Sequence, residues 1–137
     1  MVKGIDHIGI AVPSIAEARL FYERLGLTVE AIEEVEAEGV RVAIIPCGGV
    51  RIELLEPLSP ESTVGRYLEK KGPGLHHVCL ASDGVAADCA NLRAAGVPLL
   101  RDEPTPGAEG ALVQFIHPKG AGGVLYELSE RPGGEHH

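Results

Sequence analysis

The segment IDHIGIA at residues 5–11 decides the fold, because LHHVCLA at residues 75–81 repeats its pattern. In both segments β-branched or other apolar residues alternate around a histidine, as in a half-buried strand. The histidine of each segment precedes a glycine, Gly26 or Gly96, by the same number of residues. Such self-similarity predicts an internal duplication.

A second pair of segments extends the repeat towards the end of each half. GVRIEL at residues 49–54 corresponds to GVLYEL at residues 123–128, so that Glu53 and Glu127 occupy equivalent places. Each half therefore begins with a histidine-bearing strand and ends with a glutamate-bearing strand.

The first half is expected to have the order β-α-β-β-β. Pro13 ends the first strand, Ser14 and Glu17 form a capping-box pattern, and Gly26 stands where a C-terminal cap is favoured. The expected strands are 4–12, 27–35, 39–46 and 50–56. The apolar residues expected on one face of the helix are Ile15, Ala18, Leu20, Phe21 and Leu25.

The second half repeats this order, with Asp83 as the expected helix cap. Its expected elements are a strand at 75–82, a helix at 84–95 and strands near 97–102, 110–117 and 123–130. A linker helix near 61–71 begins after Ser59-Pro60 and ends at Gly72-Pro73-Gly74. The sequence thus predicts one α+β domain at 1–137, divided into module one at 4–57, a linker at 58–74, module two at 75–130 and a tail at 131–137. We expect the tail to fray and regard His136 and His137 as tail residues.

Composition narrows the class of protein. The net charge of −8 disfavours nucleic acid and anionic membranes as partners. No apolar run approaches the ~18 residues of a membrane span, and the start has no signal-peptide pattern, so a cytoplasmic protein is expected. The three cysteines, Cys47, Cys79 and Cys89, are widely spaced, which predicts reduced thiols.

His7, Glu53, His77 and Glu127 are the candidate site. Strand alternation turns the apolar neighbours of each glutamate towards the helix and the glutamate to the opposite face. A pseudo-twofold relation between the halves can then bring all four side chains together. Two imidazoles and two carboxylates suit cobalt, nickel, zinc or manganese. Alternatively, these four are ordinary polar strand residues that face solvent, or they belong to a dimer surface.

These motifs resemble the vicinal oxygen chelate (glyoxalase-like) superfamily and, within it, the methylmalonyl-CoA epimerases. The paired histidines at 76 and 77 and the His117-Pro118-Lys119 turn are the most discriminating. The segments that carry the resemblance are IDHIGIAV (5–12), ELLEPL (53–58), STV (62–64), GLHH (74–77), DEP (102–104), FIHPK (115–119) and GVLYEL (123–128).

The resemblance implies a metal-dependent epimerase that interconverts (2R)- and (2S)-methylmalonyl-CoA by α-proton transfer through a metal-stabilised enolate. It places one divalent metal, cobalt first, on the four candidate ligands. Glu127 and Glu53 are the expected acid–base groups, and Lys119 and His76 the expected substrate contacts. Some family members carry a second glutamate at the position of Val42, so Glu53, a bound water and His76 all stay open as the second proton carrier.

Three other functions share this fold. Glyoxalase I uses a similar metal set and is the strongest alternative, although the linker helix and the His117-Pro118-Lys119 turn speak against it. A sequestering protein would not need four metal ligands, and an extradiol dioxygenase needs ferrous iron with two His and one Glu. For the acyl-CoA thioester, Lys70 and Lys71 are weaker candidate phosphate contacts than Lys119. Open sheets of this kind usually pair, so we expect a homodimer.

Overall fold

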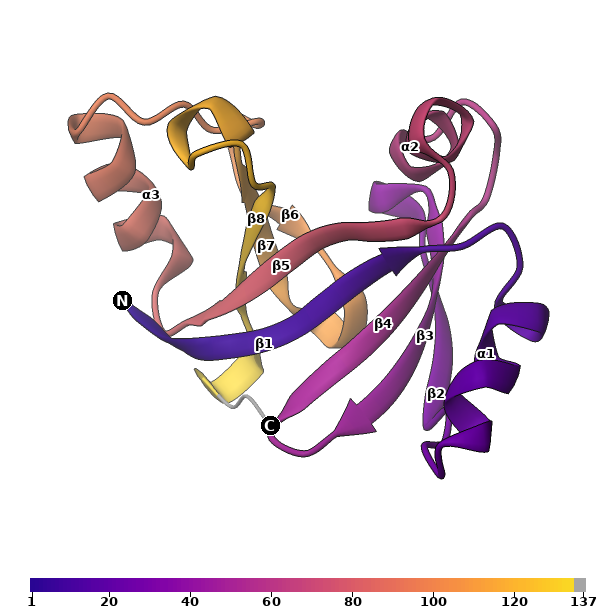
Figure 1. The fold of residues 1–137 in the computed structure, drawn as a ribbon. Coiled ribbons are helices and arrows are strands. Elements are labelled where there is room, and N and C mark those ends of the chain that lie inside the picture. Colours follow the sequence, from indigo (N-terminus) through magenta and orange to yellow (C-terminus); the bar gives the residue numbers. More distant parts are fainter. Residues whose placement is uncertain (135–137) are drawn as a thin grey trace. The chain divides into compact units, whose positions relative to one another are not determined.

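The computed structural model describes residues 1–134 and divides the chain into two compact units (Figure 1). One unit comprises residues 7–76, and the other comprises residues 1–6 together with the chain from His77 onward. His136 and His137 lie outside the described residues.

Three α-helices and eight strands account for most of the described chain. The helices are α1 (Ile15–Arg24), α2 (Thr63–Lys71) and α3 (Val85–Ala94). The strands are β1 (Val2–Ala11), β2 (Ala31–Val35), β3 (Val40–Cys47), β4 (Val50–Pro57), β5 (Gly74–Ser82), β6 (Thr105–Pro106), β7 (Leu112–Ile116) and β8 (Tyr126–Glu130). The short 3-10 helices are η1 (Glu36–Glu38), η2 (Ala108–Gly110), η3 (Pro118–Gly120) and η4 (Pro132–Gly134).

The unit of residues 7–76 has the predicted β-α-β-β-β order. Its strands lie in the order β2-β3-β4-β1, with β1 parallel to β4 and the other pairs antiparallel. Helix α1 packs on one face of these strands (Figure 1). The buried core beneath it consists of Val12, Ile15, Ala43, Ile45 and Leu54.

The other unit repeats this arrangement with β5-β8-β7-β6. Strand β5 is parallel to β8, and β7 is antiparallel to both β8 and β6. Helix α3 covers the core made by Val85, Cys89, Ile116 and Leu128. The duplication predicted from the sequence is therefore present in both strand order and helix placement.

Two predicted strands are shorter or displaced. β2 begins only at Ala31, and no regular strand forms over 97–102. Leu99 makes one isolated bridge with Ile116, while Pro98 and Leu100 exchange single backbone hydrogen bonds with the β7 end. Pro98 has no N–H to donate, which limits a continuous ladder there.

Helix caps follow local side-chain chemistry, with one correction. The Ser14 side chain accepts a hydrogen bond from the Glu17 N–H, as predicted. The predicted cap Asp83 is wrong: Gly84 is the N-cap, and the Asp83 carboxylate pairs with Lys3. Helix α2 begins slightly later than predicted, because the Ser62 hydroxyl caps it by accepting from the Gly65 N–H.

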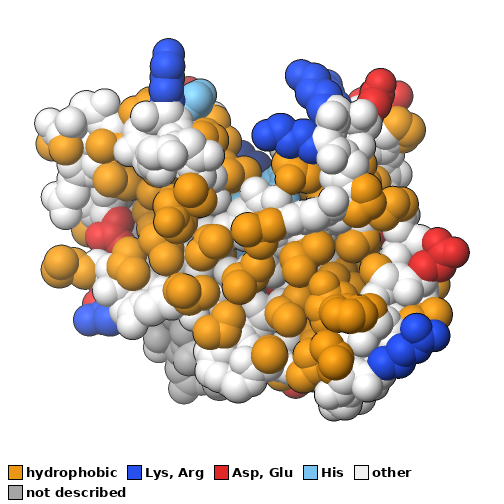
Figure 2. All heavy atoms as spheres, viewed as in Figure 1, with side chains coloured by type: hydrophobic (Ala, Val, Ile, Leu, Met, Phe, Trp, Pro, Cys, Tyr) orange, Lys and Arg blue, Asp and Glu red, His pale blue; other side chains and the backbone are white. Residues whose placement is uncertain are grey.

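The predicted apolar face of α1 is only partly buried. Ile15 belongs to the core, with Ala18 packed against it. Leu20, Phe21 and Leu25 are instead 51%, 61% and 65% exposed. Hydrophobic side chains are visible beside α1 on the face in Figure 2. The helix thus carries an apolar surface beyond the stripe that its own sheet covers.

None of the helices in the described residues has the length and apolar character needed to cross a membrane.

Candidate functional site

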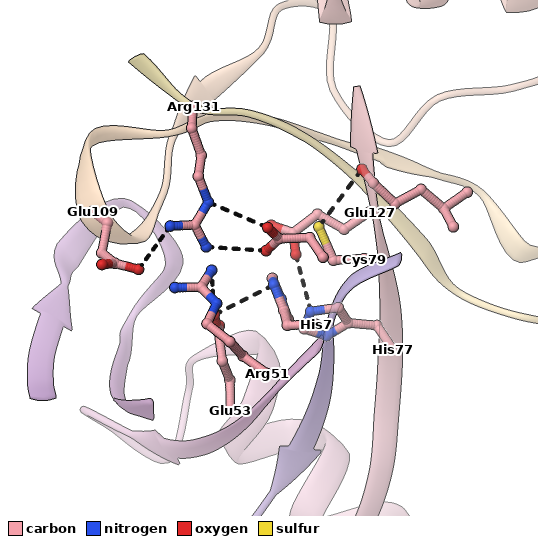
Figure 3. Close-up of polar contacts among 10 residues, drawn as sticks. His7, Arg51, Glu53, His77, Cys79, Glu109, Glu127 and Arg131 are labelled. Carbon is pink, nitrogen blue, oxygen red and sulfur yellow. Dashed lines mark hydrogen bonds and ion pairs between the residues drawn. The ribbon is translucent and has the colours of Figure 1, made fainter. Parts of the chain in front are cut away.

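His7 and Glu53 lie on adjacent parallel strands of one unit. The register pairs Gly9 with Glu53, two residues beyond His7, so both side chains project from the same face. Nδ1 of His7 is 3.3 Å from Oε2 of Glu53, and the two residues are 6% and 3% exposed (Figure 3). The result is a buried imidazole–carboxylate pair.

His77 and Glu127 form the corresponding pair in the other unit. Here Cys79, two residues beyond His77, is in register with Glu127. Nε2 of His77 is 3.0 Å from Oε1 of Glu127, and both residues are buried (Figure 3). The offset between histidine and glutamate is the same in β1–β4 as in β5–β8. The sequence repeat therefore produces a repeated register and one His–Glu pair per unit.

The neighbours of each glutamate point the other way, as strand alternation predicts. Leu54 is buried in the core under α1, and Ile52 packs against that core. Leu128 is buried under α3, with Tyr126 packed beside it. Each glutamate is thus held on the face opposite its helix by two apolar anchors.

The donor atoms fit a divalent cation. Oε2 of Glu53 and Oε1 of Glu127 are both buried, and each lies against an imidazole nitrogen. An imidazole nitrogen and a carboxylate oxygen that lie this close together can both direct lone pairs to one cation. Nitrogen and oxygen donors of this kind suit first-row divalent metals.

The two predicted substrate contacts differ in their surroundings. Lys119 is exposed in η3, where its backbone N–H donates to Nδ1 of His117 over 3.0 Å. His76 is half-buried on β5, and its ring lies 4.9 Å from the ring of Tyr67 in an edge-to-face contact. Lys71 lies over the same tyrosine ring, at 5.9 Å.

Val42 occupies the β3 position at which some family members carry a second glutamate. It is 3% exposed and pairs with Leu55 on one side and Glu33 on the other. The aliphatic side chain carries no proton, so this position contributes no acid–base group in this chain.

Three charged residues that are buried in the fold were not predicted from the sequence. Arg51 is two residues before Glu53 and 7% exposed, and its Nη2 is 3.3 Å from Glu53 Oε2. Asp6 and Arg131 are also buried and paired with each other. The alternation that singled out Glu53 could have identified Arg51, since both residues share one strand face. No local pattern links Asp6 to Arg131.

Comparison with known proteins assigns the family. Residues 6–115 match the model of the glyoxalase/bleomycin resistance protein/dioxygenase superfamily. The mitochondrial methylmalonyl-CoA epimerase of Mus musculus is 38% identical, over 92% of this chain and 72% of the mouse protein. The ethylmalonyl-CoA/methylmalonyl-CoA epimerase of Cereibacter sphaeroides is 37% identical, over 95% of this chain and 99% of that protein.

A solved structure extends the likeness to three dimensions. A methylmalonyl-CoA epimerase in complex with methylmalonyl-CoA and NH4+ is 37% identical and superimposes with a TM-score of 0.92, covering 100% of both chains. The predicted α+β fold of two tandem βαβββ modules is confirmed by this match. The protein accordingly belongs to the methylmalonyl-CoA epimerase family, within the vicinal oxygen chelate (glyoxalase-like) superfamily.

Proposed function

We propose that this protein is an epimerase that interconverts (2R)- and (2S)-methylmalonyl-CoA by removing and returning the α-proton. The observation that carries the proposal is the buried His–Glu pair repeated in one register on β1–β4 and β5–β8. Support comes from relatives named as epimerases and from the structure of one of them with methylmalonyl-CoA.

The two pairs are proposed to share one divalent cation, held by His7, Glu53, His77 and Glu127. When bound, such a cation supplies Lewis-acid charge that makes the α-proton of a chelated thioester more acidic. Cobalt is our first choice among the metals, and nickel, zinc and manganese fit the same donors. The burial of all four side chains supports this assignment, because a buried carboxylate is stabilised by a cation.

Glu127 and Glu53 are proposed as the acid–base groups. A carboxylate within reach of the substrate's α-carbon can accept its proton, and the protonated acid can return one. Val42 cannot carry a proton, so a second acid–base group must come from another residue. Glu53 is proposed for this role because it is a buried carboxylate that lies against His7 in its own unit. The short contact with His77 holds the Glu127 carboxylate in a defined orientation.

Lys119 and His76 are proposed as contacts to the acyl-CoA. Coenzyme A carries phosphates, and a chain with a net charge of −8 must offset them locally. Lys119 is exposed on a turn whose backbone is fixed by His117, which makes its ammonium available to a phosphate.

A homodimer is also proposed, since open sheets of this architecture commonly pair. The exposed Leu20 and Phe21 on α1, together with the exposed Leu25 at its C-cap, support an apolar contact. Light scattering should give twice the 14.4 kDa chain mass. A wild-type mass equal to one chain contradicts the dimer, and Phe21→Glu should shift a dimer towards the monomer.

The reaction is tested by incubating one epimer of methylmalonyl-CoA with the metal-loaded protein in deuterated water. We expect the second epimer to appear with deuterium at the α-carbon. A parallel assay with the methylglyoxal–glutathione adduct distinguishes glyoxalase I. If the protein converts that adduct and leaves the α-proton of methylmalonyl-CoA in place, the epimerase proposal is wrong.

A further inference from the structure

Phe115 is a buried aromatic residue packed against one of the proposed metal ligands. On the antiparallel strands β7 and β8 it is in register with Glu127, so the two side chains share one face of the sheet. The centroid of its ring is 5.5 Å from that of the His77 ring, and the two ring planes meet at 82°. The three residues belong to the same compact unit. Phe115 therefore forms a wall beside the second His–Glu pair.

The ring of Phe115 is itself held in place by its neighbours. The guanidinium carbon of Arg101 lies 5.2 Å from the ring centroid, within the range of a cation–π contact. The Phe115 carbonyl accepts a hydrogen bond from the Leu100 N–H over 2.9 Å. The fully buried Gln114 side chain accepts from the Phe115 N–H over 2.8 Å and donates to the Arg101 carbonyl over 2.9 Å. These contacts fix both the backbone and the ring of Phe115.

The orientation of the His77 ring decides which of its atoms faces the glutamate. Nε2 of His77 is 3.0 Å from Oε1 of Glu127 (Figure 3). The χ2 torsion of a histidine has broad minima, so the backbone alone does not fix the plane of the ring. A half-turn about the Cβ–Cγ bond would put the carbon Cε1 in the place of Nε2, and a carbon cannot bind a metal. Packing against a rigid neighbour restricts that rotation.

The duplicated unit has a different residue at the corresponding place. Ile44 is in register with Glu53 on β3 and β4, as Phe115 is with Glu127 on β7 and β8. Ile44 is also buried, but its side chain is aliphatic. This strand arrangement therefore accepts an aliphatic residue at the position, which indicates that the aromatic ring of Phe115 serves more than the packing of the sheet.

We propose that Phe115 is a positioning residue that fixes the plane of the His77 imidazole and keeps Nε2 directed at Glu127. The inference rests on the proposed function, in which His77 is a metal ligand. Phe115 has no metal-binding or acid–base group, so its effect passes through His77. Residues that orient a metal ligand from outside typically change metal affinity about 10- to 100-fold when they are replaced.

The test follows the His77 ring in metal-free protein and then measures cobalt binding. Phe115→Ile installs the residue of the duplicated position, and Phe115→Leu is a second variant with a different aliphatic shape. NMR of the imidazole carbons, by chemical shift and relaxation dispersion, detects exchange between ring orientations. We expect one orientation of the His77 ring in wild type and a second in both variants, as exchange broadening or as separate signals. The dissociation constant for Co²⁺, measured by competition with a chelator, should rise about 10-fold.

Ile116→Val is the matched control. Ile116 neighbours Phe115 on β7, but its side chain is in the core under α3. Ile116→Val should lower the urea midpoint and leave both the His77 ring and the Co²⁺ affinity as in wild type, which separates positioning from general stability. A single, wild-type orientation of the His77 ring in both Phe115 variants overturns the proposal, as does a second orientation in Ile116→Val or an unchanged Co²⁺ affinity in the Phe115 variants. The ring is observed without metal or substrate, so failure of the wild-type protein to epimerise methylmalonyl-CoA refutes the proposed function separately.

Discussion

Arg131 reaches Asp6 across almost the whole length of the chain. Its Nε lies 3.2 Å from Oδ1 and its Nη2 3.3 Å from Oδ2, so that both carboxylate oxygens are engaged. The two residues are 8% and 1% exposed. Nη1 of Arg131 also donates to Glu109 over 3.0 Å (Figure 3). The residue that we expected to open a frayed tail is instead part of a buried ion pair that ties β1 to the chain after β8.

Breaking this pair from one side should destabilise the fold. Arg131→Met leaves the buried Asp6 carboxylate without the Arg131 guanidinium. Asp6→Leu leaves the buried Arg131 guanidinium without the Asp6 carboxylate. We expect each substitution to lower the free energy of unfolding by about 3–5 kcal/mol. Urea denaturation followed by circular dichroism measures the loss.

The double variant provides the control for this ion pair. With both charges gone, apolar side chains of similar size occupy the site, and stability should recover towards wild type. A double variant whose loss equals the sum of the two single losses would show that the residues act independently.

Metal binding should depend on the histidine of each pair. His77→Ala removes a proposed ligand, and we expect its metal content, measured by elemental analysis on the purified protein, to fall well below that of wild type. His117→Ala is the matched control, because this histidine accepts a hydrogen bond from the Lys119 backbone and belongs to neither pair. Equal stoichiometric metal in wild type and His77→Ala would overturn the ligand assignment.

Replacing Glu127 or Glu53 by glutamine should separate the acid–base role of each residue from its role in metal binding. Glutamine keeps an oxygen donor and cannot act as a carboxylate base. Glu127→Gln should therefore slow α-proton exchange about 10²- to 10⁴-fold, measured by deuterium uptake. Glu53→Gln should retain metal, because the amide keeps an oxygen donor, and should also slow exchange if Glu53 is the second proton carrier. Undiminished exchange in Glu53→Gln would exclude Glu53 from that role.

Gly65 should resist replacement although it lies in a helix. A Cβ at this position would be 2.6 Å from the carbonyl oxygens of both Ser59 and Pro60. Alanine normally stabilises a helix interior by about 1 kcal/mol relative to glycine. Here the close approach to backbone atoms should reverse the sign, so Gly65→Ala should lower the urea midpoint.

Gly4→Ala is the comparison for this prediction. Apart from Gly4 itself and its two chain neighbours, no described residue has an atom within 4 Å of a Cβ built at Gly4, so the midpoint should stay the same or rise. A Gly65→Ala variant as stable as Gly4→Ala would mean that the turn before α2 relaxes without cost.

The sequence by itself determined the repeated unit and the orientation of its key side chains. Alternation within a strand depends only on the backbone, so the opposite facing of Glu53 and Leu54 could be predicted without a structure. Local capping chemistry placed the start of α1 at Ser14 in the same way. Motif resemblance identified the family before any contact was known.

Tertiary structure decided what depends on neighbours distant in the chain. The Asp6–Arg131 pair needs β1 and the end of β8 to meet, and the burial of Arg51 depends on the strand placed beside it. The N-cap of α3 is Gly84 and not the predicted Asp83 for the same reason, because the Asp83 carboxylate pairs with Lys3 of β1. Local patterns specify backbone conformation and side-chain direction, whereas charge burial and pairing arise only when separate elements are packed together.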